Sequence, residues 1–244
     1  MIGDGWQVWS TYRPSDLLLF SARTYRRLFE LYNADHRAVN LLLAAGVTVL
    51  LLFVAALHRR APAPRRTLSI DALATAGLAL AWAWIAWAFH LQRYATINWI
   101  APAFAAAFAL QALLLAGRSW RLWRGTPPDN GHAMVPARRR FASLLLLALA
   151  ILYPLIGLLM DRPPGQSELV GTAPDPTAIA TLAMMLRVPA SRWPWVIPLA
   201  WLALSSGTLL LLDAADALVP VTAAVLAIAG AWRTGRQSGW GGAA

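Results

Sequence analysis

Polar side chains that could bind a ligand lie within or beside the long apolar runs of this sequence. In hydrocarbon an unpaired polar group is costly, so polar residues inside apolar segments are the first candidates for function. Imidazole, carboxylate, amide and hydroxyl groups together offer both donors and acceptors to a small solute or ion. The candidate ligand-binding residues are His90, Asn98, Tyr153, Asp175, Thr177, Ser205, Ser206 and Thr208.

The sequence APDPT, residues 173–177, predicts the start of a short helix, because proline is well tolerated in a first helical turn. The first N–H groups of a helix lack partners and carry partial positive charge, so such an end within a membrane can hold an anion or a carbonyl. Asp175 could instead cap those groups itself. The sequence LSSGT, residues 204–208, could face this end, although Ser and Thr in spanning helices often bond only to their own helix.

Two further arrangements can be drawn from polar residues, and neither has a supporting motif. Ser206 and His90 could form a hydrolase pair, but no GxSxG surrounds the serine. A carboxylate–imidazole cation site could be drawn from six residues without ligand spacing in any one helix: His36, His90, Asp161, Asp175, Asp213 and Asp216. The chain has no cysteine, Walker A loop, GxGxxG or HExxH, so we predict no catalytic residue, no metal and no cofactor.

The composition indicates a membrane protein. Hydrophobic residues make up 59% of the 244 and charged residues 13%, whereas soluble domains are about a quarter charged. A net charge of +10 would suggest nucleic acid in a soluble chain. Here the arginines lie between apolar segments, which is typical of topology signals and of contacts with anionic lipids. We expect anionic lipids at the inner face as partners, possible association with a membrane protein or a second copy, and no nucleic acid.

Seven apolar segments predict an all-α, polytopic membrane helix bundle. A spanning helix needs about 20 mostly apolar residues. One segment, residues 176–186, is only about half that length and is either a short, broken helix or a re-entrant one. The six longer segments are residues 38–57, 70–89, 97–116, 141–160, 195–212 and 217–232.

The arginines predict the orientation, because cytoplasmic loops carry an excess of Lys and Arg. If all seven segments cross, one side receives 14 of the 21 arginines, and the other receives 7. This places the N-terminus outside and the C-terminus inside a bacterial inner membrane, with most candidate ligand-binding residues in the outer half. A re-entrant fifth segment would fit less well, because it moves two arginines outward. The tryptophans agree with this orientation, because Trp prefers the headgroup level. Trp99 falls at an outer helix end, and five others fall at inner ends: Trp120, Trp123, Trp193, Trp195 and Trp232.

The chain is expected to have three regions: an N-terminal tail (1–37), the bundle (38–232) and a flexible C-terminal tail (233–244). Within the first, Ser21 is a good N-cap, and Asp35 is expected to cap the first span. The residues between them predict an interfacial amphipathic helix, which either pads the outer rim or forms a lid over an opening. Its apolar face is Tyr25, Leu28, Phe29, Tyr32 and His36, and its polar face is Arg23, Arg26, Arg27 and Glu30.

Small residues predict where the helices pack, because helices in lipid associate through close contact. Pro154 and Pro198 lie inside spans, where each frees a carbonyl and permits a kink. The predicted seams are Ala101, Ala105, Ala109 and Ala112 on the third span and Ala223, Ala227 and Gly230 on the last.

A series of motifs runs along nearly the whole chain: YRPSDLLLFSARTYRRLFELYN, WAWIAWAFHLQRYATIN, FALQALLL, LAILYPLIG, APDPT and WVIPLAWLALSSG. In combination they resemble a bacterial multi-pass inner-membrane family known as a domain of unknown function, number sixty sixty-four. The resemblance implies a membrane bundle, and some members carry a permease label that rests on hydropathy. The family's motif positions map onto Trp82, Trp84, His90, Asn98, Gln111, Tyr153, Pro154, Pro176 and Thr177.

The chain departs from the family's pattern in two places. Asp175 stands where the family often has cysteine, and DRPPG, residues 161–165, stands where it often has a His-x-Tyr-Pro run. A metal or thiol-reactive ligand bound at those positions in relatives would therefore not be bound here in the same way.

These features predict a permease-like protein that holds or passes a small solute or ion through an outward-facing polar cavity. The alternative is a non-catalytic accessory or assembly subunit of a larger membrane complex, whose amphipathic helix and small-residue seams would then contact the partner. A membrane enzyme is a third interpretation without a recognisable catalytic motif.

Overall fold

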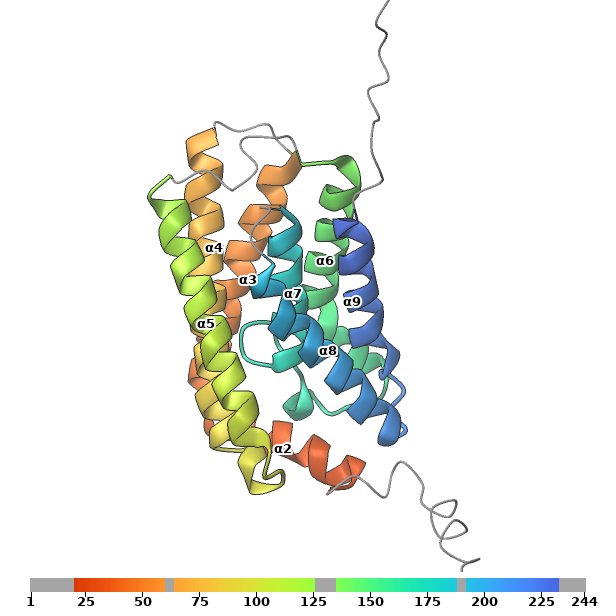
Figure 1. Ribbon diagram of the computed structural model, residues 1–244. Coiled ribbons are helices and arrows are strands. Elements are labelled where there is room, and N and C mark those ends of the chain that lie inside the picture. The colour runs from red at the N-terminus through yellow and green to blue at the C-terminus, as the bar shows by residue number, and fades with distance from the viewer. Residues whose placement is uncertain (1–19, 60–63, 126–134, 188–191, 233–244) are drawn as a thin grey trace, which may run out of the picture.

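The computed structural model describes residues 20–59, 64–125, 135–187 and 192–232, and these residues form helices joined by short connections (Figure 1). The expected flexible tail, residues 233–244, lies outside the described residues, as does most of the region before the amphipathic helix. The helices are α2 (Ala22–Asp35), α3 (Arg37–Arg59), α4 (Pro64–Trp84), α5 (Ala101–Trp123), α6 (Ala137–Leu159), α7 (Pro174–Arg187), α8 (Trp193–Leu211) and α9 (Leu218–Ala231). Three shorter segments are the π-helix η2 (Ile85–Leu91) and the 3₁₀-helices η3 (Tyr94–Thr96) and η4 (Pro164–Gln166).

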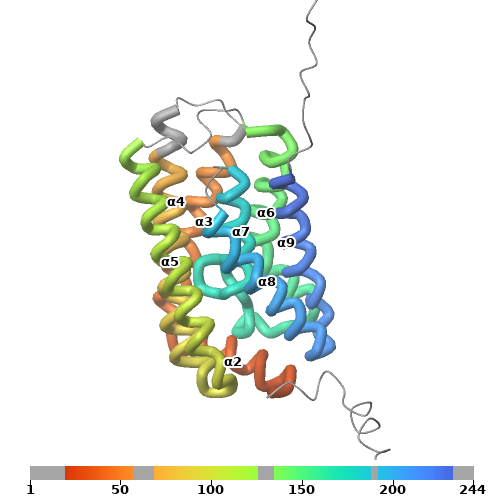
Figure 2. The backbone as a smooth tube through the Cα atoms, in the orientation of Figure 1, coloured from red at the N-terminus to blue at the C-terminus, as the bar shows by residue number. Residues whose placement is uncertain are grey.

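The helices α3 to α9 stand side by side and alternate in direction, and α2 lies across the lower end of the bundle (Figures 1 and 2). The helices α3, α5, α7 and α9 run upward in this view, and α4, α6 and α8 run downward. The predicted all-helical bundle is therefore confirmed, and each of the seven predicted segments is a helix.

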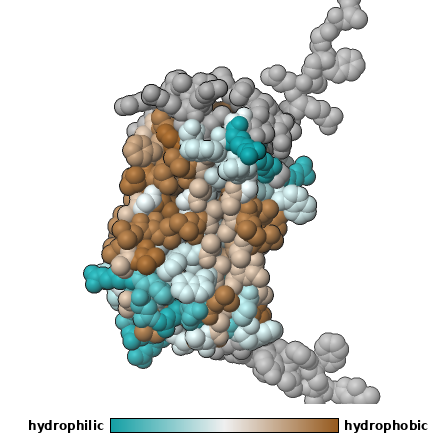
Figure 3. All heavy atoms as spheres, turned by 90° about the vertical axis from the view of Figure 1, so that its left-hand side faces the viewer, coloured by the Kyte–Doolittle hydropathy of each residue, from teal (hydrophilic) through white to brown (hydrophobic). Residues whose placement is uncertain are grey.

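Five helical stretches are long and apolar enough to cross a membrane: Arg37–Leu57, Ser69–Thr96, Ala101–Trp123, Ala137–Leu159 and Trp193–Leu211. The helix α9 is apolar but shorter. Apolar side chains cover the middle of the surface seen in Figure 3, and hydrophilic side chains gather at its lower end. Several tryptophans predicted for helix ends are exposed, as expected of side chains at a headgroup layer: Trp99, Trp120, Trp123, Trp193 and Trp232.

The short helix α7 is the centre of the molecule. All 14 of its residues are buried, and it packs against α4, α6, α8 and α9. A helix of this length extends about 21 Å, which is less than the roughly 30 Å hydrocarbon core. Because other helices surround α7, its length does not have to match the thickness of the hydrocarbon core. The chain runs upward in α7 and downward in α8 (Figure 2).

The amphipathic helix α2 begins as predicted, with the Ser21 hydroxyl accepting a hydrogen bond from the Thr24 N–H. Leu28, Phe29 and Tyr32 are buried, and the three arginines of the opposite face are exposed. Asp35, expected to cap the first span, instead ends α2 and forms an ion pair with Arg93. The apolar face of α2 thus packs onto the lower end of the bundle.

Hydrogen bonds fasten α2 to the connection between α6 and α7. The Tyr32 hydroxyl donates to the Thr172 carbonyl at 2.9 Å, and Asn33 Nδ2 donates to the carbonyls of Gly165 and Ser167, both at 2.9 Å. Because this connection leads into the buried helix α7, α2 covers the place where the chain enters the core.

The predicted seams are largely confirmed. On α9, Ala223, Ala227 and Gly230 are buried, and a Cβ on Gly230 would lie 2.7 Å from the Ala142 Cβ, so only glycine fits this contact of α9 with α6. On α5, three of the four predicted alanines are buried, but Ala109 is exposed and does not belong to the seam. Each step of four residues turns about 40° around an α-helix, so Ala109 lies about 80° from Ala101 and outside the face that contacts other helices.

Pro198 in α8 leaves a carbonyl that another helix satisfies. A residue at position 198 with an N–H would donate to the Pro194 carbonyl, four residues earlier, and proline cannot. Gln111 of α5, which is fully buried, donates from Nε2 to that carbonyl at 3.0 Å. Gln111 therefore replaces the missing bond of the helix.

Gln111→Leu is expected to lower the free energy of unfolding by about 1–3 kcal/mol, because it leaves the Pro194 carbonyl buried without a donor. Pro198→Ala restores the N–H of α8, so the double variant should recover part of this loss. Thermal unfolding of the four proteins in detergent measures the coupling between the two sites. If Pro198→Ala changes stability equally in both backgrounds, the two residues do not share the carbonyl.

Candidate solute-binding site

A buried carboxylate, Asp175, is the centre of the most ordered polar site among the described residues. It lies in the first turn of α7 and is 4% exposed. Its Oδ2 accepts hydrogen bonds from the Ser205 hydroxyl at 2.7 Å and the Tyr153 hydroxyl at 3.1 Å, and its Oδ1 accepts from Trp201 Nε1 at 2.7 Å. Hydrogen bonds to an ionised acceptor are roughly twice as strong as those between neutral groups. Three neutral donors thus take the place of water around this carboxylate.

Three of the eight sequence-predicted ligand-binding residues meet at this point: Tyr153 from α6, Asp175 from α7 and Ser205 from α8. The predicted approach of residues 204–208 to the start of α7 is therefore observed. Sequence reasoning missed Trp201. The available signal was its position four residues before Ser205, which places both side chains on one face of a helix.

The start of α7 has few N–H groups to offer an anion. Pro174 and Pro176 have no N–H, and the Thr177 N–H points to the Ala173 carbonyl at 3.4 Å. The Asp175 carboxylate accepts from three side chains of neighbouring helices rather than capping its own helix. Its negative charge would also repel an anion, so the idea of an anion site at this helix end loses its physical basis.

A cavity of about 320 Å³ lies at the lower end of the bundle, between α2, the connection from η3 to α5, and α8. Six of the eleven residues that line it are aromatic, and none is charged. Trp201 and Ser205 belong to both this wall and the Asp175 site, so the carboxylate lies directly behind the wall. The lining residues are Phe20, Tyr25, Tyr94, Asn98, Trp99, Ile100, Phe104, Trp201, Leu204, Ser205 and Thr208.

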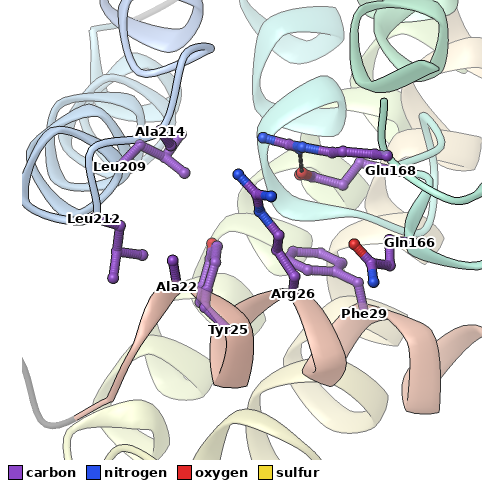
Figure 4. A pocket seen from close by; sticks show the side chains of 10 residues that line it. Ala22, Tyr25, Arg26, Phe29, Gln166, Glu168, Leu209, Leu212 and Ala214 are labelled. Carbon is purple, nitrogen blue, oxygen red and sulfur yellow. Dashed lines mark hydrogen bonds and ion pairs between the residues drawn. The ribbon is translucent and has the colours of Figure 1, made fainter. Parts of the chain in front are cut away.

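A second group of charged side chains lies between α2 and the rest of the bundle. Arg162 Nη1 is 3.3 Å from Glu168 Oε1, and Arg162 Nη2 forms an ion pair with Asp216 Oδ1. Figure 4 shows Tyr25, Arg26 and Phe29 of α2 pointing toward this group. The space between them is about 10 Å³, which suits one water molecule and not a solute.

Burial raises the pKa of Glu168 well above its usual value, the charge of Asp175 adds to this, and Arg162 opposes it. With Asp175 and Asp216, this part of the bundle holds three carboxylates and two guanidinium groups, those of Arg162 and of the exposed residue Arg26. Burying charge without full compensation is costly, so the region favours an added positive charge, either a proton or a cation.

His90 is fully buried in the π-helix η2, and neither ring nitrogen has a hydrogen-bond partner among the described residues. Its ring lies against the back of the cavity wall, with centroids 5.2 Å from Trp201 and 6.0 Å from both Tyr94 and Phe104. Single π-helical turns occur frequently at functional sites. His90 therefore belongs to the layer of side chains directly behind the cavity.

Comparison with known families agrees with the resemblance. The family of unknown function DUF6064 matches residues 22–240, which is most of the chain. The chain belongs to this family. Neither a curated protein nor a solved structure matches this DUF6064 chain.

Four other predicted ligand-binding residues of this DUF6064 chain have hydrogen bonds within the fold. Asn98 Oδ1 accepts from the Ile100 N–H before α5, and Thr177 Oγ1 accepts from the Gly171 N–H at 2.8 Å. Ser206 Oγ accepts from the Val221 N–H, and Thr208 Oγ1 donates to the Leu204 carbonyl of its own helix. Asn98 and Thr208 nevertheless line the cavity, whereas Thr177 and Ser206 serve the backbone.

The hydrolase pair and the cation site drawn from the sequence are not formed. Ser206 bonds to the start of α9, and His90 is surrounded by aromatic rings. Among the residues that the structure describes, no group of three or more His, Asp or Glu side chains could hold a metal ion.

Two of the DUF6064 motif tryptophans connect helices to the core. Trp82 Nε1 donates to Thr181 Oγ1 of α7 at 2.8 Å. Trp84 Nε1 donates to both the Tyr32 hydroxyl, at 2.9 Å, and Asn40 Oδ1, at 3.0 Å. These two positions therefore hold α7 and α2 in place and do not line the cavity.

Proposed function

We propose that this protein binds a small solute in the aromatic cavity at the α2 end and passes it through the bacterial inner membrane as a permease does. The cavity is the observation that carries the proposal. Its volume of about 320 Å³ lies within the usual range of small-molecule sites, roughly 300–1,000 Å³. Its walls combine large aromatic surfaces with a few polar groups, as ligand sites commonly do.

The proposed orientation places the cavity on the outer side, with the N-terminal tail outside and the C-terminus inside. The support is the arginine count, 14 of 21 on the opposite side if seven segments cross. The arginines at that end would contact anionic lipid headgroups.

No residue of α7 lines the cavity, and all 14 residues of α7 are buried within the bundle. Passage of a solute would therefore need α7 and its neighbours to move. In this proposal the structure is the outward-open state, and the covered helix α7 closes the inner side.

Filling the cavity tests the proposal. Thr208 lines the cavity, and its hydroxyl bonds only to its own helix, so Thr208→Trp should block the space at little cost in stability. We expect it to abolish solute-dependent thermal stabilisation in a broad panel of amines, amino acids, sugars and carboxylates, and to abolish flux into liposomes.

The matched control is Leu210→Trp, on the same helix but exposed and away from the cavity, which should behave as wild type. If the wild-type protein shows neither stabilisation nor flux with any solute of the panel, the proposed function is wrong. Equal binding by wild type and Thr208→Trp would place the solute elsewhere.

A further inference from the structure

We propose that the aromatic cavity selects a small organic cation carrying a methylated ammonium group, with the buried Asp175 carboxylate as its counter-charge. This inference rests on the proposed function, since it names the solute class of the same cavity. It depends on three independent properties of the cavity: the arrangement of its rings, the sign of the surrounding charge, and the state of its polar groups.

Six aromatic residues line the cavity, which we call the box, and several of their rings pack against one another. Tyr94 and Phe104 stack with centroids 6.1 Å apart and planes 22° apart. Trp201 stands nearly perpendicular to Phe104 at 5.7 Å, and Phe20 stands nearly perpendicular to Tyr94 at 5.9 Å. A cation within about 6 Å of a ring centroid is attracted by the ring face, and quaternary ammonium groups are bound where several aromatic side chains meet.

The charged group directly behind the wall of the box is a carboxylate. No arginine lines it, and Asp175 is bonded to two of its wall residues, Trp201 and Ser205. The carboxylates also act on a residue of the wall. Burial raises the pKa of Tyr25, which lines the box, and the charges of Glu168, Asp175 and Asp216 raise it further. An anionic solute would be repelled here, and a cation would be attracted.

Three polar side chains of the box already make hydrogen bonds within the fold. The Ser205 hydroxyl donates to Asp175, Asn98 Oδ1 accepts from the Ile100 N–H, and the Thr208 hydroxyl donates to the Leu204 carbonyl. A hard metal ion is usually held by carboxylate oxygens, and no carboxylate is among the described residues that line the box. A primary ammonium needs hydrogen-bond acceptors, whereas a methylated ammonium needs only apolar contact and a nearby negative charge. The box therefore favours the methylated group.

Choline and its uncharged analogue 3,3-dimethylbutan-1-ol test the inference, because they have nearly the same shape and differ in charge. Binding of each to the purified full-length protein in lipid nanodiscs is measured by titration calorimetry. We expect choline to bind at least about tenfold more tightly than the alcohol, the scale of one desolvated cation–aromatic contact.

Two substitutions test the cage and the counter-charge separately. Phe104→Leu removes a ring of the box, and Asp175→Asn removes the charge while retaining an oxygen acceptor. Each should weaken choline binding about tenfold, while binding of the alcohol should change less. Phe141→Leu and Asp161→Asn are the matched controls, because Phe141 and Asp161 are exposed and do not line the cavity.

The outcomes separate this inference from the proposed function. Equal binding of choline and the alcohol, or choline binding that survives both Phe104→Leu and Asp175→Asn in folded protein, would overturn the cation class while leaving a solute cavity in place. If a sugar or carboxylate of the panel binds and choline does not, the inference is wrong and the proposed function stands. Thermal unfolding of each variant establishes that a loss of binding is not a loss of fold.

Discussion

Asp175→Ala is expected to lower the free energy of unfolding by about 3–5 kcal/mol, because it removes the acceptor of three buried hydrogen bonds at once. The Tyr153 hydroxyl, the Ser205 hydroxyl and Trp201 Nε1 would all remain buried without their shared partner. The three donors come from α6 and α8, so the change also loosens both helices against α7. Thermal and denaturant unfolding in detergent, followed by tryptophan fluorescence, measures the loss.

Two graded variants serve as controls for this prediction. Ser205→Ala removes only one donor and should cost about 1 kcal/mol. Asp175→Asn keeps an oxygen that can accept from Trp201, so its loss of stability should lie between those of Ser205→Ala and Asp175→Ala. If Asp175→Ala is as stable as wild type, the three donors find other partners and Asp175 is not the structural centre of this site.

Asp71→Ala is expected to have an effect of similar size at the opposite end of the bundle. Asp71 of α4 and Arg187 at the end of α7 form a buried ion pair, with Arg187 Nε 2.6 Å from Asp71 Oδ1 and side-chain exposures of 8% and 5% for Arg187 and Asp71. Arg118 of α5 is a second guanidinium close enough to act on Asp71. Removing the carboxylate takes the ion-pair partner from Arg187 and a nearby negative charge from Arg118. We expect this to lower the free energy of unfolding by about 3–5 kcal/mol.

Arg187→Met is the informative partner of this variant. It removes one cation and leaves Asp71 beside Arg118, so it should cost less than Asp71→Ala. Unfolding of the two single variants and of the double variant Asp71→Leu/Arg187→Met gives the coupling energy. If Arg187→Met is the more damaging single change, Arg118 does not share the carboxylate.

Together these sites fix α7 at both ends, at Asp175 to α6 and α8 and at Arg187 to α4. Between them, the Ser143 hydroxyl of α6 donates to the Ala183 carbonyl, and Trp82 bonds to Thr181. A movement of α7 relative to its neighbours would therefore strain one or both of these end sites. In the proposed function, the Asp71–Arg187 pair is the contact that would open on the inner side.

The sequence by itself determined the helices. The positions of α3 to α9 follow from the length of apolar runs, which is a local property of the chain, and prolines mark several helix starts. The helix α2 was predictable for the same reason: Ser21 and the spacing of Leu28, Phe29 and Tyr32 are local signals. The approach of Ser205 to Asp175 was also predicted, as one alternative, because both lie near one predicted face of the membrane.

Only the tertiary structure decided the site. The cavity brings together residues from Phe20 to Thr208, and no local pattern relates an aromatic ring in the first tail to one in α8. The donor Trp201, the exposure of Ala109 and the pairing of Asp35 with Arg93 depend in the same way on how the helices are rotated and packed. Hydrophobicity specifies which segments are helices in a membrane, but every segment is apolar, so hydrophobicity alone does not select its neighbours. That choice depends on close packing and on a few buried polar contacts.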